Sequence, residues 1–268
     1  MSKRVRAAFL LLLATELAGC AGPAASPTPL PRAHAHNDYE HARPLFDALE
    51  RGFCGVEADV YLVDGRLLVA HDRKDVKPER TLEALYLDPL RARVQANGGR
   101  VFRHGPPLTL LVDVKSEAEA TYAAIQRALQ PYTAILTVFR GERIEPGAVT
   151  IIISGNRARE TMAAQPVRHA ALDGRKADLD ANPPASLVPL VSDNWNNHFV
   201  SRWAGPLSAA DHETLRQWVE RAHAQGRRLR FWNTPDRPEV WQTLVEAGVD
   251  VIGTDDLAGL ERFFAARK

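Results

Sequence analysis

The stretch Gly55-Val56-Glu57-Ala58-Asp59-Val60 places two carboxylates in a run of small and apolar residues. A Glu-x-Asp pair more often marks a solvated face, but these neighbours are typical of a strand buried on both sides. Side chains two apart on a strand share a face, so Glu57 and Asp59 point the same way. Because an unpaired buried carboxylate is costly, the stretch predicts a strand that carries a functional site.

The next residues predict a hairpin. Residues 62–67 read Leu-Val-Asp-Gly-Arg-Leu, with an Asp-Gly pair between apolar runs. Asp-Gly is a strong signal for a two-residue turn between antiparallel strands. The hairpin places His71 just past its second arm.

Outward from this stretch, short apolar strands alternate with amphipathic helices. The expected strands are residues 32–36, 55–60, 108–114, 148–153, 169–172, 187–191, 229–232 and 249–253. The expected helices are residues 44–51, 81–95, 117–129, 157–164, 208–225, 238–247 and 256–266. Such alternation predicts a parallel sheet with crossover helices, and at this length closure into a barrel is favoured over an open sheet. The prediction is a single α/β domain, a (β/α)₈ TIM barrel with a short β-hairpin insertion after the second strand.

Composition supports one globular domain. The chain has 268 residues, 45% of them hydrophobic and 25% charged, with a net charge of +1. Basic and acidic residues are interspersed, so we expect no nucleic-acid partner. We also expect a monomer. No Gly-x-Gly-x-x-Gly follows the first strand, which argues against a dinucleotide-binding fold.

The N-terminus has the pattern of an export signal. Lys3, Arg4 and Arg6 precede a short apolar core, and Leu17-Ala18-Gly19-Cys20 resembles a bacterial lipobox. This reading predicts a signal peptide over residues 1–19, lipidation of Cys20, a tether over 20–31 and a catalytic domain over 32–268. It places the protein in a bacterial cell envelope, anchored to the membrane by lipid and facing the periplasm, with the outer membrane favoured. The alternative is an ordinary secretory signal with a chance cysteine.

Polar residues follow the early strands, where barrel enzymes build their active sites. They are His34 and His36 at the end of the first strand, Glu57 and Asp59 at the end of the second, His71 after the hairpin, and Asp113 and Lys115 at the end of the third. Three converging carboxylates favour a bound cation, and oxygen ligands without a cysteine-rich set favour Mg²⁺, with Ca²⁺ possible. Two histidines on separate strand ends would serve as general base and general acid.

The run from Gly55 to Val60, then Asp64-Gly65, then His71-Asp72, resembles the signature of glycerophosphodiester phosphodiesterases. The resemblance implies a barrel fold, His36 and His71 as catalytic residues, and Glu57, Asp59 and Asp113 as ligands of one divalent cation. It implies that Lys115 contacts the phosphate, and it extends to Arg230-Phe231-Trp232-Asn233, where an aromatic residue lines the pocket.

Two departures from that signature point to another branch. His36-Asn37-Asp38 stands where the family has His-Arg-Gly, and no Glu-Asn-Thr follows. Together with Ser154-Gly155-Asn156-Arg157, this run is similar to the branch named for the altered inheritance of mitochondria protein. Asn37, Arg157 and Arg230 are therefore candidate substrate contacts, and Trp232 and Trp195 are candidates for a pocket wall or for packing. His34 shares a face with His36, which is preferred because it lies nearer the strand end.

These residues predict a metal-dependent phosphoric diester hydrolase. Its expected substrate is a small-molecule or lipid-derived phosphodiester, either a glycerophosphodiester or a phospholipid head group. The alternative from another class is a periplasmic lipoprotein that binds a phosphorylated ligand without cleaving it. A metal-dependent isomerase or aldolase would need a lysine or further histidines on the middle strands, which the sequence does not offer.

Overall fold

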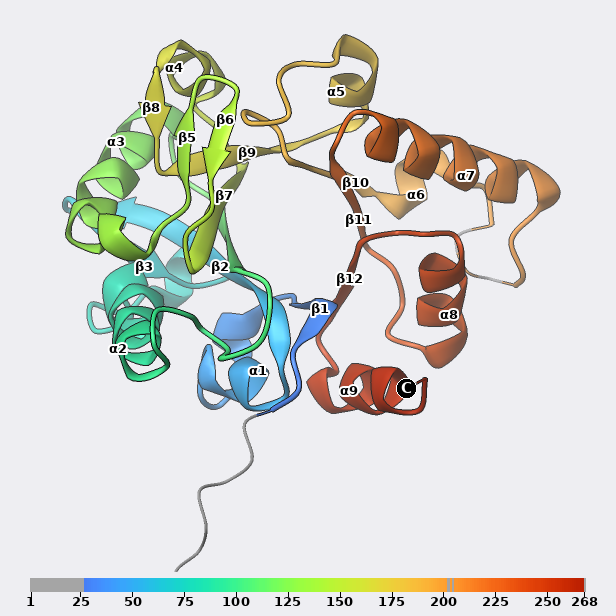
Figure 1. The fold of residues 1–268 in the computed structure, drawn as a ribbon, viewed down its shortest axis with the longest axis horizontal. Coiled ribbons are helices and arrows are strands. Elements are labelled where there is room, and N and C mark those ends of the chain that lie inside the picture. Colours follow the sequence, from blue (N-terminus) through green and yellow to red (C-terminus); the bar gives the residue numbers. More distant parts are fainter. Residues whose placement is uncertain (1–26, 202, 204, 268) are drawn as a thin grey trace, which may run out of the picture.

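A computed structural model describes residues 27–267 except 202 and 204. Within these residues eight parallel strands form one closed ring, in the order β1-β12-β11-β10-β9-β7-β4-β2, and β2 pairs again with β1 (Figure 1). Their bounds are β1 Leu30–Ala35, β2 Phe53–Val63, β4 Leu108–Val114, β7 Val149–Gly155, β9 Ala170–Gly174, β10 Leu190–Asn194, β11 Arg228–Trp232 and β12 Val251–Thr254. The predicted (β/α)₈ TIM barrel is confirmed.

Helices surround the ring of strands (Figure 1). Their bounds are α1 Phe46–Glu50, α2 Asp88–Ala96, α3 Ala118–Leu129, α4 Arg159–Ala164, α5 Lys176–Ala181, α6 Trp195–His198, α7 Ala209–Ala224, α8 Pro238–Glu246 and α9 Leu257–Ala265. A π-helical turn, Glu83–Leu87, leads into α2. Helix α7 is capped at both ends: Ser208 Oγ accepts a hydrogen bond from the Asp211 backbone at 3.0 Å, and Gly226 follows with a φ of 68°. No helix among the described residues is both long and apolar enough to cross a membrane.

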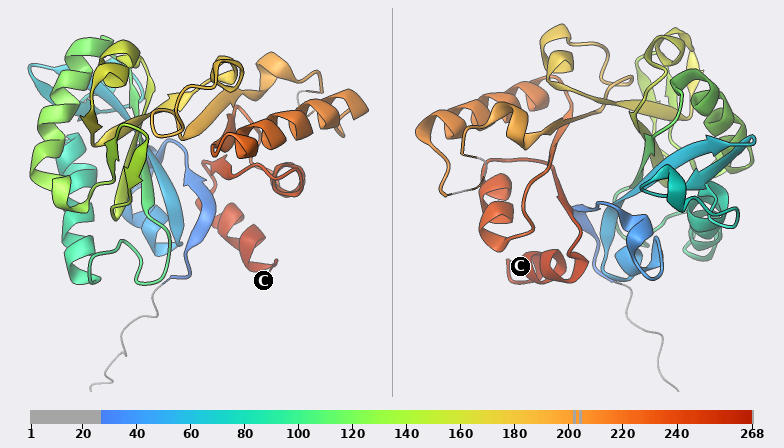
Figure 2. Two further views of the ribbon diagram at one scale, coloured as in Figure 1. Left: turned by 45° about the horizontal axis from the view of Figure 1, so that its top comes forward. Right: turned by 180° about the vertical axis from the view of Figure 1, so that it is seen from behind.

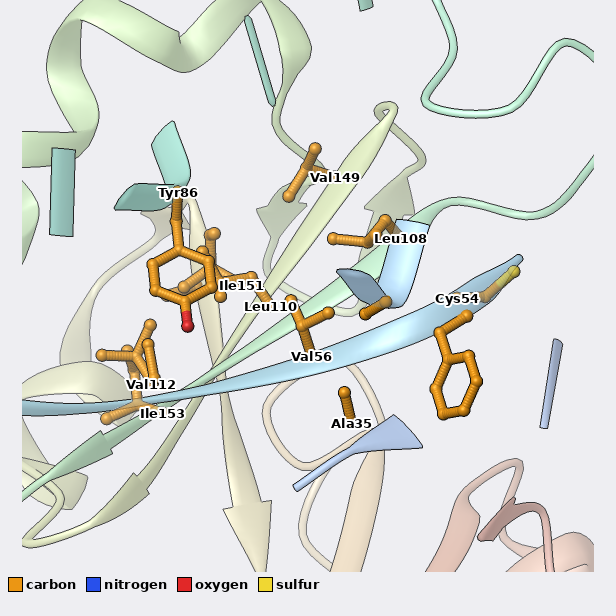
Figure 3. Close-up of a cluster of buried hydrophobic side chains, with 14 of the residues drawn as sticks. Ala35, Cys54, Val56, Tyr86, Leu108, Leu110, Val112, Val149, Ile151 and Ile153 are labelled. Carbon is orange, nitrogen blue, oxygen red and sulfur yellow. The ribbon is translucent and has the colours of Figure 1, made fainter. Parts of the chain in front are cut away.

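The strands have two different faces. The outer face packs against the helices through a large apolar core, part of which Figure 3 shows: Ala35, Val56, Leu110, Val112, Ile151 and Ile153. A smaller cluster fills the barrel interior: Leu111, Phe139, Ile152, Ala171, Leu190 and Val251. Because side chains alternate along a strand, a residue next to Val56 points into the barrel. Glu57 and Asp59 therefore face the interior.

The predicted hairpin is present. β3, Arg66–Val69, pairs antiparallel with the end of β2, and the turn residues Asp64 and Gly65 have φ angles of 48° and 77°. Two consecutive positive φ angles define the type I′ turn that Asp-Gly favours. The hairpin extends outward from the ring of strands (Figure 2, right). His71 follows its second arm, as expected.

Several short strands differ from the sequence-based expectation. A small antiparallel sheet, β5 Val138–Arg140, β6 Arg143–Glu145 and β8 Val167–Arg168, lies next to the starts of β7 and β9. Its strands are only two or three residues long, too short for a periodic signal. Strand β10 begins at Leu190 rather than at 187, because Pro189 has no N–H to donate to a ladder.

Candidate active site

Three carboxylates meet at the carboxyl end of the barrel. Strands β2 and β4 run parallel with Asp59 opposite Asp113, and Glu57 lies two residues before Asp59 on the same face. Glu57, Asp59 and Asp113 each offer an oxygen within 4.8 Å of the others. The sequence predicted these three residues as one group, and the structure brings them together.

Glu57 is held by two buried partners. Its Oε2 accepts hydrogen bonds from His34 Nε2 at 3.0 Å and from Arg230 Nη2 at 2.7 Å. Burial opposes ionisation of Glu57, but the positive charge of Arg230 and the His34 bond outweigh burial, so its pKa lies well below its usual range. Burial, aided by the charge of Arg230, lowers the pKa of His34 to about 4. His34 is therefore neutral at pH 7, and it orients Glu57 instead of carrying protons to a substrate.

Asp59 and Asp113 share Lys115, whose Nζ lies 2.9 Å from Asp59 Oδ2 and contacts Asp113 Oδ2 still more closely. Burial raises the pKa of Asp59 to about 6, with Lys115 opposing the rise and the two other carboxylates adding to it. Burial also raises the pKa of Asp113. The Oδ1 atom of Asp59 is buried without a hydrogen-bond partner among the described residues. A buried carboxylate oxygen without a partner, in an all-oxygen donor set, fits a hard divalent cation.

His36 has a carboxylate partner that the sequence analysis did not identify. Its Nδ1 lies 2.9 Å from Asp255 Oδ1, just beyond β12, and the side chain of Asn37 reaches the same oxygen at 3.3 Å. Burial lowers the pKa of His36, but the bond to Asp255 and the charge of Glu57 outweigh it, so the net shift is upward. The histidine that the sequence preferred is thus half-exposed, polarised and fixed in orientation.

His71 reaches the carboxylates through Tyr39, a second residue that the sequence analysis missed. The Tyr39 hydroxyl lies 2.7 Å from Asp59 Oδ2, 2.8 Å from Asn37 Oδ1 and 3.1 Å from His71 Nδ1. A hydroxyl has one proton, so when Tyr39 donates to Asp59 its oxygen accepts from His71 Nδ1. The ring of His71 is 60% exposed and its Nδ1 lies 3.5 Å from Asp59 Oδ2.

A cleft opens beside His36 and is also lined by Trp232, Asn233 and Asp255. Trp232 is 38% exposed, as expected for a pocket wall. Trp195 is fully buried and stacks on Phe199 at 3.7 Å between ring centroids, so it is a packing residue.

The predicted arginines have different surroundings. Arg230 lines the cleft, but its guanidinium is 4% exposed and is engaged by Glu57. Arg157 lies beyond β7 and donates to the backbone carbonyl of Asp173 on β9, away from the cleft beside His36. Arg230 is thus a partner of Glu57, and Arg157 is a partner of the β9 backbone.

Fold and site together define a class, the barrel phosphodiester hydrolases, and comparison with known proteins agrees. The model of the AIM6-like phosphodiesterase domain matches residues 26–172, and that of the glycerophosphoryl diester phosphodiesterase family matches residues 228–258. The two matches cover the strands that carry the carboxylates and the strands that carry Arg230 and Asp255. The chain belongs to the AIM6-like phosphodiesterase domain family.

Fungal proteins named for the altered inheritance of mitochondria are similar to this chain over most of their own length. "Altered inheritance of mitochondria protein 6 homolog" of Arthroderma benhamiae is 30% identical over 88% of this chain and 84% of its own. "Altered inheritance of mitochondria protein 6" of Eremothecium gossypii is 28% identical over 87% of this chain and 69% of its own. The protein of that name from Saccharomyces cerevisiae is 25% identical over 89% and 70%.

These relatives overturn the predicted location. The relatives are fungal proteins named for mitochondrial inheritance. The prediction of a lipid-anchored protein in a bacterial cell envelope is therefore wrong. The residues on which it depended, the signal over 1–19 and Cys20, lie outside the described residues.

Proposed function

We propose that this protein is a metal-dependent phosphodiesterase that cleaves a small or lipid-derived phosphodiester, a glycerophosphodiester or a phospholipid head group. One observation carries the proposal: Glu57, Asp59 and Asp113 converge within 4.8 Å beside two histidines whose Nδ1 atoms already have partners. Family membership supports the reaction class.

Glu57, Asp59 and Asp113 would hold one divalent cation, with Mg²⁺ favoured over Ca²⁺. Both protein contacts of Glu57 use Oε2, which leaves Oε1 for a ligand, and Asp59 Oδ1 has no partner among the described residues. A cation bound there would offset the negative charge that grows on the phosphate during cleavage.

The two histidines divide the proton transfers between them. Asp255 accepts from His36 Nδ1, which leaves His36 Nε2 free to take a proton from the attacking water or hydroxyl. Tyr39 engages His71 Nδ1, which leaves His71 Nε2 as the atom that would deliver a proton to the leaving oxygen. Asn37 and Tyr39 connect the surroundings of the two histidines, because their side chains contact each other. Asn37 also contacts Asp255, the partner of His36, and Tyr39 also contacts Asp59, which lies beside His71.

Two further side chains contact the substrate in this proposal. Lys115 contributes positive charge at the carboxylates, where it lies next to any phosphate held there. Trp232 offers an exposed aromatic face to the leaving group or acyl-bearing part of the substrate.

An assay of the full chain on a chromogenic phosphodiester, with Mg²⁺, with Ca²⁺ and with chelator, tests the proposal. We expect cation-dependent turnover that His36→Ala and Glu57→Gln each abolish. Thermal unfolding gives an independent readout: Mg²⁺ at 100 times its Kd should stabilise wild type by about 2.7 kcal/mol, should stabilise His36→Ala equally, and should stabilise Glu57→Gln far less.

Turnover that persists in chelator would refute metal dependence. A folded, cation-binding protein that binds phosphodiesters but cleaves none, natural lipid head groups included, would refute the hydrolase and support the non-catalytic binding protein.

A further inference from the structure

A second polar group lies next to the carboxylates at the barrel mouth, on the strands that adjoin β4 in the ring. It consists of Ser154 on β7, Asp173 on β9, Arg175 just after β9, and Ser192 on β10. Asp173 is 1% exposed, and its Oδ2 accepts from Ser154 Oγ at 2.8 Å and from Arg175 Nη1 at 2.8 Å. A buried carboxylate that bonds one guanidinium fixes the position of that guanidinium.

The inner side of the Arg175 guanidinium is saturated. Nη1 donates to Asp173 Oδ2 and to the Gly174 carbonyl, both at 2.8 Å, and Nη2 reaches Ser154 Oγ at 3.3 Å. The backbone is fixed too, because the Arg175 N–H donates to Asp178 Oδ2 at 2.8 Å at the start of α5.

The outer edge of the same guanidinium is free. Nε and the second hydrogen of Nη2 have no protein partner in the part of the chain that the structure describes, and the side chain is 30% exposed. This edge is the one that binds an oxyanion in a two-pronged manner. By contrast, Arg230 is committed to Glu57, and Lys115 is committed to Asp59 and Asp113.

The register places this edge close to the carboxylates. Asp113 on β4 pairs with Ser154 on β7, and neighbouring strands lie about 4.8 Å apart. Ser154 in turn bonds both Asp173 and Arg175. A phosphate held beside Asp113 is therefore close to the Arg175 side chain.

We propose that Arg175 binds a non-bridging oxygen of the scissile phosphate, and that Asp173 is the positioning residue that aims it. The inference rests on the proposed function, since it adds a substrate contact to the same site. It predicts that the phosphate binds between two groups: the carboxylate site on β2 and β4, and the guanidinium of Arg175, which follows β9.

The test uses the full chain with Mg²⁺ and two readouts. Calorimetry measures the affinity for inorganic phosphate, and hydrolysis of bis(p-nitrophenyl) phosphate, which has a single anionic group, gives kcat and KM. The variants are Arg175→Ala, Arg175→Gln, Arg175→Lys and Asp173→Asn, with Arg216→Ala as the matched control. Arg216 is an exposed α7 arginine that also forms ion pairs.

We expect Arg175→Ala and Arg175→Gln to weaken phosphate binding and to lower kcat/KM by about 10- to 100-fold, the loss typical of a charged hydrogen bond. Arg175→Lys should restore part of both, while Arg216→Ala should match wild type. Asp173→Asn should lower kcat in the wild-type background and add little in Arg175→Gln, because it acts through the arginine.

Phosphate affinity and kcat/KM within twofold of wild type in Arg175→Gln would overturn the inference, as would a wild-type protein that binds no phosphate. Arg175→Gln retains a polar group for Asp173, so it separates this outcome from misfolding of the alanine variant. A wild type that cleaves no diester but binds phosphate through Arg175 would refute the proposed hydrolase and leave this contact standing.

Discussion

Glu57 and Asp59 are two residues apart on one strand, yet their surroundings move their pKa values in opposite directions. Both are buried, and burial alone raises the pKa of a carboxyl group. Glu57 has Arg230 and His34 on one oxygen, which outweigh burial, whereas Lys115 does not outweigh it at Asp59. The site thus combines a firmly ionised carboxylate with one whose burial is not fully offset by its counter-charge, Lys115.

Asp255→Asn tests the polarisation of His36. Asp255 is one of the groups that raise the pKa of His36, together with Glu57 and against burial and Arg230. Removing its charge should lower that pKa, so the rising limb of the kcat/KM–pH profile should move to lower pH. We expect kcat to fall by about 10- to 100-fold as the ring loses its orientation. Asp64→Asn, on the hairpin turn, is the control; an unmoved limb in Asp255→Asn would contradict the role of His36 as base.

Lys115→Met tests the competition between an ammonium group and a cation. Lys115 Nζ forms ion pairs with Asp59 and Asp113, the same carboxylates that would hold the metal. Removing a like charge should tighten Mg²⁺ binding by about tenfold, while turnover falls because the phosphate loses a positive contact. Calorimetric titration with Mg²⁺ measures the first effect, with the exposed Lys77→Met as control. Weaker Mg²⁺ binding in Lys115→Met would show that the lysine supports the site.

Strand alternation was sufficient to predict Glu57, Asp59 and Asp113 as one group, because the face of a strand is a local property. The partners of these residues could not be predicted in the same way. Arg230 is 173 residues from Glu57, and Asp255 is 219 residues from His36. Their contacts exist because β11, β12 and β1 are neighbours in the closed ring, and closure is set by the packing of the whole chain.

Among the elements, the long ones were predictable and the short ones were not. The strand Leu108–Val114 and the helix Ala118–Leu129 show enough apolar periodicity to be read from sequence. Helix α5 has six residues and five of them are charged or small, so it has no such signal. It bears on the proposed phosphate contact, because Asp178 in its first turn accepts a hydrogen bond from the backbone N–H of Arg175.

Strand β2 allows a matched pair of Gly→Ala substitutions. At Gly55 a Cβ would lie 2.7 Å from Nδ1 of His34, so Gly55→Ala should displace the ring that holds Glu57. We expect weaker Mg²⁺ binding and a loss of about 1–3 kcal/mol in unfolding free energy. Gly65, in the turn after β2, has a φ of 77° and open space around it. Gly65→Ala should cost roughly 1 kcal/mol through strain alone, with Mg²⁺ affinity unchanged. Equal Mg²⁺ affinities in the two variants would contradict a positioning role for His34.

At the scale of the molecule, the barrel keeps its stability and its chemistry on different surfaces. The outer strand faces and the helices form the main apolar core, while the interior face turns polar at the carboxyl end of the ring. A large side chain buried outside the ring should therefore affect unfolding, and one exposed at the mouth should affect substrate binding.

Two tryptophans test that separation. Trp195 is fully buried between Phe199 and Trp203, with ring centroids 3.7 and 4.3 Å away, whereas Trp232 is 38% exposed in the cleft. Trp195→Ala should lower the free energy of unfolding by about 3–5 kcal/mol, because it removes a large buried ring and leaves a cavity. Trp232→Ala should change that free energy by less than about 1 kcal/mol but raise KM several-fold for a lipid-derived diester. Denaturant unfolding measures the unfolding free energy of both variants, and steady-state kinetics measures their KM. If Trp195→Ala raised KM without a loss of stability, Trp195 would belong to the pocket wall, and the cleft would extend further over β10 than the structure indicates.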